Sequence, residues 1–269
     1  MGTQLLSSPF FVPKAAAAEL SEIRDRGYLI VAVKDNRAPL GFVDAAGDLS
    51  GFEIDIARRL AAEILGDESA VRLVPVRNED RLNAVITDEV DIAIAAITLT
   101  ASRRRIVNFS DPYYLDGTAF MTNQPEVQRL QDLRLGTIAL LDRSSTVAHV
   151  RYILPGARLV GVGSYAEGQS MLQNGTVDAF AGDVSVLTGW QRALASQPYR
   201  LLPSIISVEP LSVAIPKGVQ YQPLQAAINQ VIRRGYEAGW LQERAAFWGL
   251  PAESTQFIEL SPPANPTAN

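Results

Sequence analysis

The chain contains no cysteine and a single histidine, His149. Without cysteine it can form neither a disulfide nor a thiolate zinc site, and it has no cysteine nucleophile. One histidine argues against a histidine-based catalytic triad and against a metal site built from several histidines. No apolar run approaches the roughly 18 residues that cross a bilayer. These absences favour binding over catalysis, and we expect no metal and no cofactor.

The chain also has fewer positively charged than negatively charged residues. The 269 residues include 24 lysines and arginines against 29 acidic residues, which gives a formal net charge of −5. This balance argues against a general nucleic-acid binder or a protein that binds anionic membranes, but it leaves room for a local basic pocket. Apolar residues make up 47% of the chain, enough for a sizeable core in one large domain or two modest ones.

Both ends of the chain differ in composition from the rest. Leu5–Ala18 is a short apolar stretch that ends in alanines, like a secretory signal with an A-x-A cleavage site, although a full basic n-region is missing. We therefore expect residues 1–20 to be a signal remnant or a disordered arm. Ser261–Asn269 is rich in proline, alanine and asparagine, so we expect a disordered tail over 253–269.

Between these ends, short apolar runs alternate with helical patterns. The runs predict strands over Tyr28–Val33, Val71–Val76, Asp91–Ile97, Leu135–Leu141, Val177–Ala181 and Leu211–Pro216. Apolar residues at helical spacing predict helices over Phe52–Ile64 and Leu224–Tyr236. Strand–helix alternation indicates parallel sheets covered by helices. The pattern runs twice along the chain, which favours two similar halves.

Polar residues gather where the predicted strands end. Ligands of open parallel α/β sheets bind beyond the carboxyl ends of the strands. The polar residues at those ends are Lys34, Arg81, Thr98, Thr100, Arg103, Ser144, Ser145, Thr146 and Asp183. A carboxylate and hydroxyls suit an ammonium group, whereas a guanidinium and main-chain N–H groups at a helix start suit a carboxylate. The set predicts a small zwitterionic ligand, and its excess of positive charge predicts a second negative group on that ligand.

Each of these residues also has a structural interpretation. Arg103 begins a run of three arginines, which is typical of a solvated face, and Arg81 could be an exposed helix charge. Asp183 could cap the helix that follows it, and Thr98 could be an ordinary strand residue. Lys34 is harder to explain in this way, because it directly follows a core strand in a chain with only three lysines.

Four stretches of the chain resemble the motifs of one protein family in order and spacing. They are Gly51–Ala57 (GFEIDIA), Val90–Asp91 followed by Ile97–Arg103, Asn108–Tyr114 (NFSDPYY) and Gly175–Asp183. Together they resemble the bacterial extracellular solute-binding proteins of family 3, the polar amino-acid group of ABC importers. The resemblance implies an α/β fold of the type II periplasmic-binding-protein class, with two parallel or mixed sheets joined by a two-strand hinge.

The resemblance also implies how the chain is divided and where it acts. Lobe 1 would cover 21–115, lobe 2 would cover 116–209, and the chain would return to lobe 1 over 210–252. The protein would be a monomer of the periplasm that delivers an amino acid to the transmembrane subunits of an ABC permease. We expect no nucleic-acid partner.

The family assigns roles to several of the strand-end residues. Thr98 and the Ala96 carbonyl would meet the ligand's ammonium group, with Asp183 as its counter-ion. Arg103 would bind the α-carboxylate, helped by the main-chain N–H of Ser145, and Ser144 would be a further contact from the second lobe. These roles are implied by the resemblance alone.

Lys34 and Arg81 fall where acidic-amino-acid binders of the family carry cations for the side-chain carboxylate. The chain therefore resembles the glutamate/aspartate-binding subgroup most. The alternative is a neutral polar ligand such as glutamine, in which case Lys34 and Arg81 would pair with protein carboxylates such as Asp35 or Glu79.

The chain departs from the family pattern at two positions. The family often places an aromatic residue that stacks on the ligand near position 37, where this chain has Arg37. The usual glycine before the hydroxyl residues is Arg143, so we expect a different local backbone. Arg37, as another cation, Leu40 and Thr146 are further ligand-binding candidates, and His149 is expected at the surface or between the lobes.

Two further functions compete with amino-acid binding. Some relatives of this fold are dehydratases of cyclic acids, so a cyclohexadienyl-dehydratase-like enzyme is an alternative. It would need an acid or base in the cleft, for which only His149 and Glu209 present themselves. A sensor ectodomain would need an adjacent membrane span.

Overall fold

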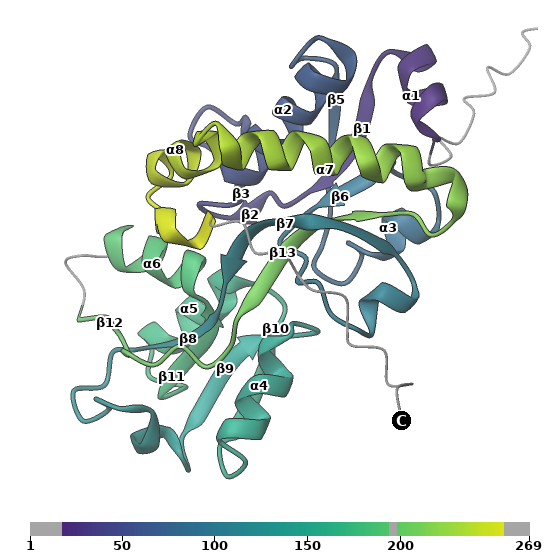
Figure 1. The fold of residues 1–269 in the computed structure, drawn as a ribbon. Coiled ribbons are helices and arrows are strands. Elements are labelled where there is room, and N and C mark those ends of the chain that lie inside the picture. The colour runs from purple at the N-terminus through teal and green to yellow at the C-terminus, as the bar shows by residue number, and fades with distance from the viewer. Residues whose placement is uncertain (1–17, 194–197, 256–269) are drawn as a thin grey trace, which may run out of the picture.

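A fully buried apolar strand lies inside each of two β-sheets. All five residues are buried in β1 (Leu29–Val33), and the same holds for β11 (Ala179–Asp183). Strands buried on both faces need helices on both sides, and Figure 1 shows helices packed around each sheet. The computed structural model describes residues 18–193 and 198–255, so most of the predicted N-terminal arm and the tail from residue 256 lie outside the described residues.

The first sheet has five strands in the order β5, β1, β6, β13 and β7. Their bounds are β5 Val71–Pro75, β1 Leu29–Val33, β6 Ile92–Ile94, β13 Glu209–Ile215 and β7 Asn108–Asp116. β1 pairs in parallel with β5 and β6, whereas β13 runs antiparallel to both β6 and β7. The sheet is therefore mixed, and its parallel part carries the strand ends at which a ligand is expected.

The second sheet also has five strands, in the order β10, β9, β11, β8 and β12. Their bounds are β10 Arg158–Val162, β9 Thr137–Leu141, β11 Ala179–Asp183, β8 Thr118–Thr122 and β12 Arg200–Leu201. β9 pairs in parallel with β10 and β11, and β8 is antiparallel to β11 and β12. The two sheets thus share a plan of parallel strands beside antiparallel ones.

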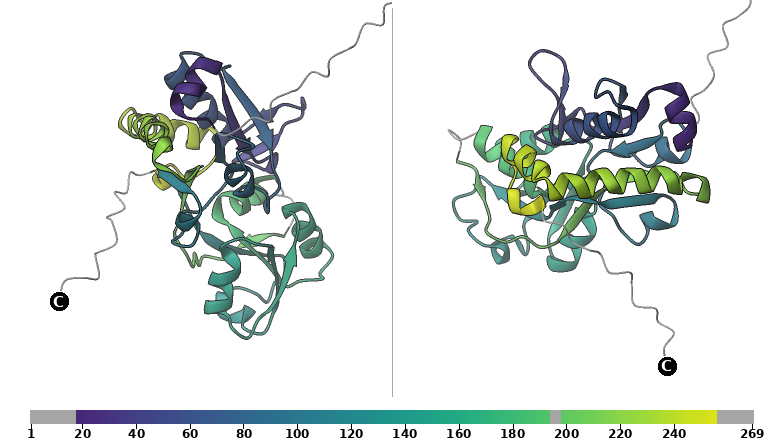
Figure 2. Two further views of the ribbon diagram at one scale, coloured as in Figure 1. Left: turned by 90° about the vertical axis from the view of Figure 1, so that its right-hand side faces the viewer. Right: turned by 45° about the horizontal axis from the view of Figure 1, so that its top comes forward.

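Two neighbouring segments connect the sheets. β7 belongs to the first sheet and leads directly into β8 of the second, while β13 brings the chain back. β7 and β13 pair with each other, with Glu209 opposite Asp116 where the segments leave the first sheet. The left view of Figure 2 shows the resulting lobes on either side of this connection. The predicted two-lobed α/β fold with a two-strand hinge is confirmed.

Helices cover both sheets, and a small sheet extends the first lobe. The first lobe carries α1 (Leu20–Arg26), α2 (Phe52–Leu65), α3 (Asn83–Ile86), α7 (Gln222–Glu237), α8 (Trp240–Phe247) and the small sheet β2 (Asn36–Arg37), β3 (Gly41–Val43) and β4 (Leu49–Ser50). The second lobe carries α4 (Thr146–Ile153), α5 (Tyr165–Gln173) and α6 (Val184–Ala193). Short 3-10 helices span Arg103–Arg105, Leu130–Leu133, Val219–Tyr221 and Ala252–Thr255. None of the helices within the described ranges combines the length and apolar character that a bilayer crossing requires.

The side chains of β1 alternate between two hydrophobic clusters, as the period of a strand demands. Leu29, Val31 and Val33 pack in one cluster with residues of α2, α7 and α8. Ile30 and Ala32 pack in a second cluster with residues of α3. With both faces buried, β1 is fixed in position, and so is the residue that follows it.

Local chemistry explains where two predicted elements end. α2 covers the predicted helix over Phe52–Ile64 and extends to Leu65, where Gly66 caps it with φ 85°. A glycine adopts that left-handed conformation without a steric penalty. The strand predicted over Asp91–Ile97 is shorter than expected, because Ala96 has φ 50° and cannot continue an extended strand.

Candidate ligand-binding site

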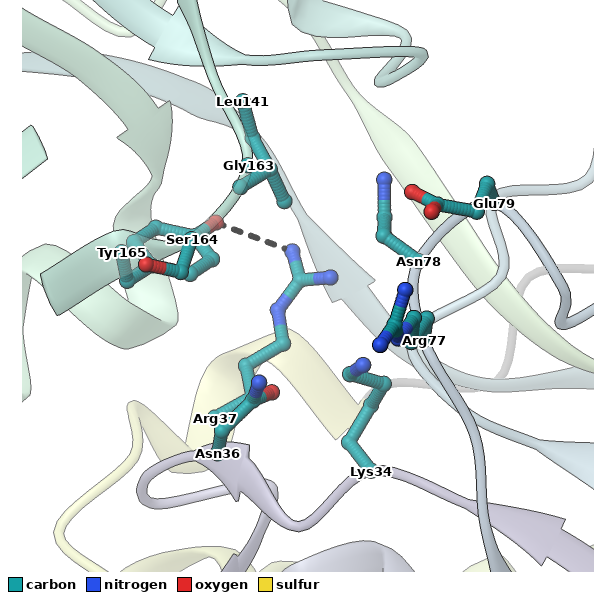
Figure 3. A pocket seen from close by; sticks show the side chains of 10 residues that line it. All are labelled: Lys34, Asn36, Arg37, Arg77, Asn78, Glu79, Leu141, Gly163, Ser164 and Tyr165. Carbon is teal, nitrogen blue, oxygen red and sulfur yellow. Dashed lines mark hydrogen bonds between the residues drawn. The ribbon is translucent and has the colours of Figure 1, made fainter. Parts of the chain in front are cut away.

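A cavity of about 280 Å³ lies between the two lobes (Figure 3). It is lined from the first lobe by Lys34, Asn36, Arg37, Arg77, Asn78 and Glu79, and from the second by Leu141, Gly163, Ser164 and Tyr165. Three of these side chains are cationic and one is a carboxylate. The cavity therefore favours an anionic group over a neutral or cationic one.

Lys34 follows β1 directly and is 3% exposed. Its ammonium group donates to the Val76 carbonyl at 2.6 Å. Burial is the largest cause that lowers the pKa of Lys34 to about 8, and the charges of Arg81 and Arg37 contribute to the same shift. No ion pair joins Lys34 to a carboxylate within the described part of the chain. An anionic ligand group would supply the missing counter-charge.

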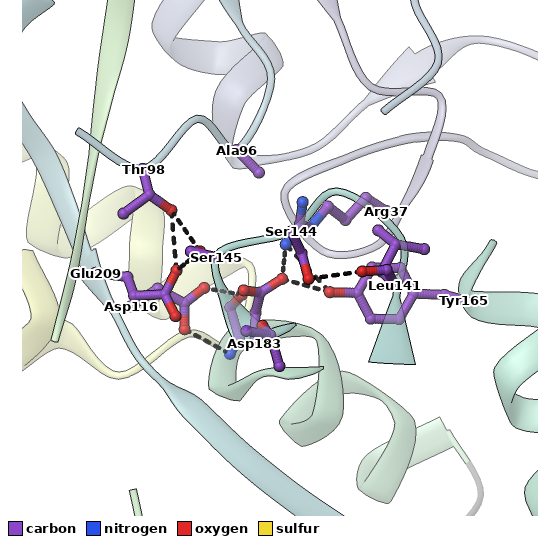
Figure 4. Close-up of polar contacts among 12 residues, drawn as sticks. Arg37, Ala96, Thr98, Asp116, Leu141, Ser144, Ser145, Tyr165, Asp183 and Glu209 are labelled. Atoms are coloured by element: carbon purple, nitrogen blue, oxygen red, sulfur yellow. Dashed lines mark hydrogen bonds and ion pairs between the residues drawn. The ribbon is translucent and has the colours of Figure 1, made fainter. Parts of the chain in front are cut away.

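Arg37 reaches across the cleft from β2. It forms an ion pair with Asp183 at the end of β11 and donates to the Tyr165 hydroxyl at 3.1 Å. The Tyr165 hydroxyl in turn donates to Asp183, and the Arg37 guanidinium lies 5.2 Å from the centre of the Tyr165 ring. In Figure 4, Asp183 lies between Tyr165 and Glu209. The predicted counter-ion of a ligand ammonium is thus paired with a cation of the protein itself.

Arg81 forms hydrogen bonds with main-chain carbonyls of the first lobe. Its guanidinium donates to the carbonyls of Asn78 at 2.9 Å, Ala95 at 2.9 Å and Ala96 at 2.7 Å. The side chain is buried and does not line the cavity. Burial lowers the pKa of Arg81, and Arg37 and Arg103 lower it further. These bonds tie the loop after the second predicted strand to the turn at Ala96.

Glu209 is the centre of a hydrogen-bond network that sequence reasoning missed. Its carboxylate accepts from the hydroxyls of Thr98 at 2.9 Å, Thr118 at 2.7 Å and Ser207 at 2.9 Å, and from that of Ser145. Burial alone would raise the pKa of Glu209, but the four hydroxyl donors outweigh it and hold the pKa below the usual value. Thr98 belongs to the first lobe and Ser145 to the second, so Glu209 joins both lobes at the hinge.

His149 of α4 lies beside this network without a hydrogen bond to it. Its Nδ1 lies 3.4 Å from a Glu209 oxygen, and its side chain is 38% exposed. This is the lobe-interface position that the sequence predicts. The sequence gives little indication of a role for Glu209, because this residue is the first of a strand and belongs to none of the four motifs.

Replacing Glu209 with glutamine is expected to lower the free energy of unfolding by about 2–4 kcal/mol, because buried hydroxyls lose a charged acceptor. The depressed pKa means that the wild-type carboxylate stabilises the fold at neutral pH and that this contribution is lost as the pH falls through the folded-state pKa. Thermal unfolding at pH 7 should therefore separate the two proteins, and the gap should narrow in acid. Glu126→Gln, at an exposed position of the second lobe, is the control; equal melting temperatures for all three proteins at pH 7 would contradict the network's role.

Arg103 differs from its two neighbours in the arginine run. It is half-buried, whereas Arg104 and Arg105 are exposed. Its Nη1 donates to the Thr98 carbonyl at 2.9 Å, and its main-chain N–H donates to the Thr100 hydroxyl at 3.2 Å. Burial lowers the pKa of Arg103, and the charge of Glu209 opposes this shift without reversing it.

The turn after β9 contains a residue in the left-handed region although that residue is an arginine. Arg143 adopts φ 57°, the left-handed conformation for which a glycine is usual, so the expected change in local backbone is wrong. Ser144 donates to the Leu141 carbonyl at 2.7 Å, Ser145 precedes the first residue of α4, and Thr146 is buried with its hydroxyl oxygen 3.5 Å from that of Thr118.

The structure thus brings the predicted residues together in three places. Lys34 and Arg37 line the cavity, and Arg37 with Asp183 and Thr98 with Ser145 form contacts across the cleft. Leu40, a further candidate, is fully buried beneath the site and accepts from the Glu53 main chain. Asn78 also crosses the cleft, donating to the Asp142 carbonyl at 3.0 Å. With these contacts the two lobes are closed on one another.

Among the described residues, no group of three or more histidine, cysteine or carboxylate side chains is arranged to hold a metal ion. The cavity and the contacts around it can hold a small polar molecule by hydrogen bonds and charge. No nucleophile paired with a base stands among the residues that line it.

Comparison with known proteins gives consistent matches. The family described as bacterial extracellular solute-binding proteins, family 3, matches residues 29–251. The glutamine-binding protein of Geobacillus stearothermophilus is 32% identical over 206 residues, which cover 76% of this chain and 78% of that protein. The glutamate/glutamine/aspartate/asparagine-binding protein BztA of Rhodobacter capsulatus is 29% identical over 212 residues, covering 76% of this chain and 63% of BztA. The solved structure of the ancestral amino acid-binding protein AncCDT-1, a precursor of cyclohexadienyl dehydratase, matches with a TM-score of 0.77 at 27% identity, covering 85% of this chain and 98% of its own.

Proposed function

We propose, from the premise that the chain belongs to the bacterial extracellular solute-binding proteins, family 3, that it binds a free L-amino acid between its lobes for an ABC importer. The favoured ligands are glutamate and aspartate. The site of action is the periplasm, and the partners are the transmembrane subunits of the importer. The protein performs no chemistry on its ligand.

The observation that carries this proposal is the charge of the interlobe cavity. Lys34, Arg37 and Arg77 line it against the single carboxylate of Glu79. Lys34 is buried beside other cations and makes no ion pair within the described residues. A ligand with a side-chain carboxylate compensates this charge, whereas a neutral ligand leaves it in place.

The α-amino acid end of the ligand is assigned to the residues around Asp183. Asp183 would pair with the ammonium group, and Arg103 with the main chain at Ser145 would hold the α-carboxylate. Arg103 belongs to the first lobe, whereas Ser145 and Asp183 belong to the second. Because only the closed arrangement offers both sets of contacts, a ligand that engages both stabilises the closed state.

Replacing Lys34 with methionine is expected to weaken glutamate binding about tenfold or more, because a hydrogen bond between two charged groups is lost. Glutamine should lose no more than about threefold. In the wild type, glutamate affinity should fall as the pH rises above about 8, where Lys34 loses its proton. A bound carboxylate stabilises the protonated lysine, so binding takes up a proton in that range. Isothermal titration calorimetry from pH 7 to 9.5 measures both effects.

The matched control is Lys217→Met, which removes an exposed lysine of the same lobe. It should leave both affinities and their pH dependence unchanged. Equal losses for glutamate and glutamine in Lys34→Met, or a flat pH profile for glutamate in the wild type, would contradict a role for Lys34 with the side-chain carboxylate.

Glutamine is the second candidate ligand. The relative from Geobacillus stearothermophilus is named a glutamine-binding protein, and BztA is named for both acids and both amides. The cavity also offers Asn36, Asn78 and Glu79, whose side chains can pair with an amide. In the calorimetric screen, tighter binding of glutamine than of glutamate would select this candidate.

An enzymatic function is the rival of a different class. AncCDT-1 is described as a precursor of cyclohexadienyl dehydratase, but the two relatives named above are solute-binding proteins. Glu209, the buried carboxylate considered above as an acid or base, accepts four hydroxyl hydrogen bonds, which keep it ionised and occupy its two oxygens, so that it has no proton to give and no free oxygen to take one. Incubation with prephenate or arogenate should give no product.

A further inference from the structure

The ion pair between Arg37 and Asp183 is the most buried charge contact between the lobes. The two side chains are 6% and 9% exposed, and they come from β2 of the first lobe and β11 of the second. Tyr165 of the second lobe binds both, as a donor to Asp183 and an acceptor from Arg37. Opening the lobes breaks both the ion pair and the hydrogen bond from Arg37 to Tyr165, and the loss of this attraction opposes opening.

Asp183 is also the residue to which the proposed function assigns the ligand's ammonium group. One carboxylate cannot pair closely with two cations in a buried site without leaving one of them poorly compensated. The Arg37 guanidinium therefore occupies the position beside Asp183 that the ammonium group of a ligand would take. A ligand with an amino group must displace it, and a ligand without one has no need to.

A second carboxyl in the first lobe can receive the displaced charge. Glu53 is fully buried, its Oε1 accepts from the Ala96 N–H and the Tyr113 hydroxyl, and its Oε2 has no hydrogen-bond partner among the described residues. Arg37 Nε is likewise buried without a partner in the described chain. The Arg37 charge already acts on Glu53 by lowering its pKa against the larger effect of burial, which raises it.

We propose that Arg37 is a built-in competitor for Asp183: it closes the lobes without ligand and gives way to the ammonium group of an amino acid. The inference rests on the proposed function for the identity of the ligand, but the closure itself does not depend on it. Two consequences follow. The ligand-free protein is largely closed, and the apparent affinity for amino acids is reduced by the fraction of molecules in which Arg37 occupies Asp183.

The competitor also sets selectivity. In the wild type, Arg37 compensates Asp183 whenever a ligand lacks an amino group, so glutarate, which is glutamate without its amino group, meets no unpaired carboxylate. When Arg37 is removed, Asp183 is compensated only by a ligand that brings an ammonium. The ratio of glutamate affinity to glutarate affinity should therefore rise.

The test is Arg37→Gln in the full chain, with Arg72→Gln as the matched control, since Arg72 is an exposed arginine of the same lobe. The ratio of glutamate to glutarate affinity is measured by calorimetry, and lobe opening by the radius of gyration from small-angle X-ray scattering without ligand. We expect the ratio to rise about tenfold or more in Arg37→Gln, in line with one lost charge pair. We also expect a larger radius of gyration that returns to the wild-type value with glutamate. Arg37→Lys keeps the charge and should resemble the wild type in both measurements.

A radius of gyration in folded Arg37→Gln equal to that of Arg72→Gln overturns the proposal. So does an affinity ratio within about twofold of the wild type. If no variant binds an acidic amino acid, the proposed function fails by itself, and the scattering measurement still decides: opening supports the Arg37 contact and an unchanged curve overturns it. Thermal unfolding of each variant establishes that it is folded, and Arg37→Met provides a second neutral variant of similar length.

Discussion

Replacing Asp183 with asparagine is expected to weaken the binding of every α-amino acid by about a hundredfold or more, the usual effect of truncating one partner of a buried charge pair. Asparagine keeps the shape and can still accept a hydrogen bond from Tyr165, so the loss isolates the negative charge. In the variant, Arg37 remains as a buried cation without its partner and repels an incoming ammonium. Calorimetry with glutamate, aspartate and glutamine should show the same large loss for all three, because the ammonium group is common to them.

Asp142→Asn is the matched control for this experiment. Asp142 is an exposed carboxylate of the same lobe, and the contact that crosses the cleft uses its main-chain carbonyl rather than its side chain. Its replacement should leave all three affinities within about twofold of the wild type. Comparable losses in Asp142→Asn and Asp183→Asn would mean that general electrostatics, not a specific pair, attracts the ligand. Full binding by a folded Asp183→Asn would remove Asp183 from the site.

Much of the fold could be predicted because apolar periodicity records burial. The run before Lys34 predicts a core strand, and β1 is buried on both faces as such a strand must be. The apolar face of Phe52–Ile64 predicts α2, and Gly66 explains its end. The small sheet β2–β4 was not predicted, since strands of two or three residues carry too little pattern. The return of β13 to the first sheet rests on long-range pairing, which no local window contains.

The candidate site was harder to predict, for a physical reason. Strand ends such as Lys34 and Asp183 can be located from the strands that precede them. Which cation pairs with Asp183 depends on how two lobes meet, and Arg37 and Asp183 belong to different lobes. Arg81 shows the same limit in reverse: its position near a predicted strand end suggested a ligand contact, but its donors point to main-chain carbonyls of its own lobe.

The hinge and the site share the same residues. Thr98 and Ser145 contact each other across the cleft, and both donate to Glu209 at the start of β13. Any ligand group that engages Thr98 or Ser145 must therefore compete or cooperate with the Glu209 carboxylate. This coupling links occupancy of the cleft to the geometry of the strand that returns the chain to the first lobe.

Arg103 provides the second large effect. Replacing it with alanine is expected to weaken amino-acid binding by about a hundredfold, because the α-carboxylate loses a two-pronged, charge-assisted contact beside Thr98. Arg103→Lys keeps the charge but not the planar fork and should lose about tenfold. The control comes from the same run: Arg104→Ala removes an exposed arginine one residue away and should bind as the wild type does.

All four proteins are titrated with glutamate and its α-amide, which lacks the α-carboxylate charge. The loss in Arg103→Ala should be much smaller for the α-amide than for glutamate. If both ligands lose equally, Arg103 supports the Thr98 turn rather than the ligand, and the α-carboxylate must be held elsewhere in the cleft.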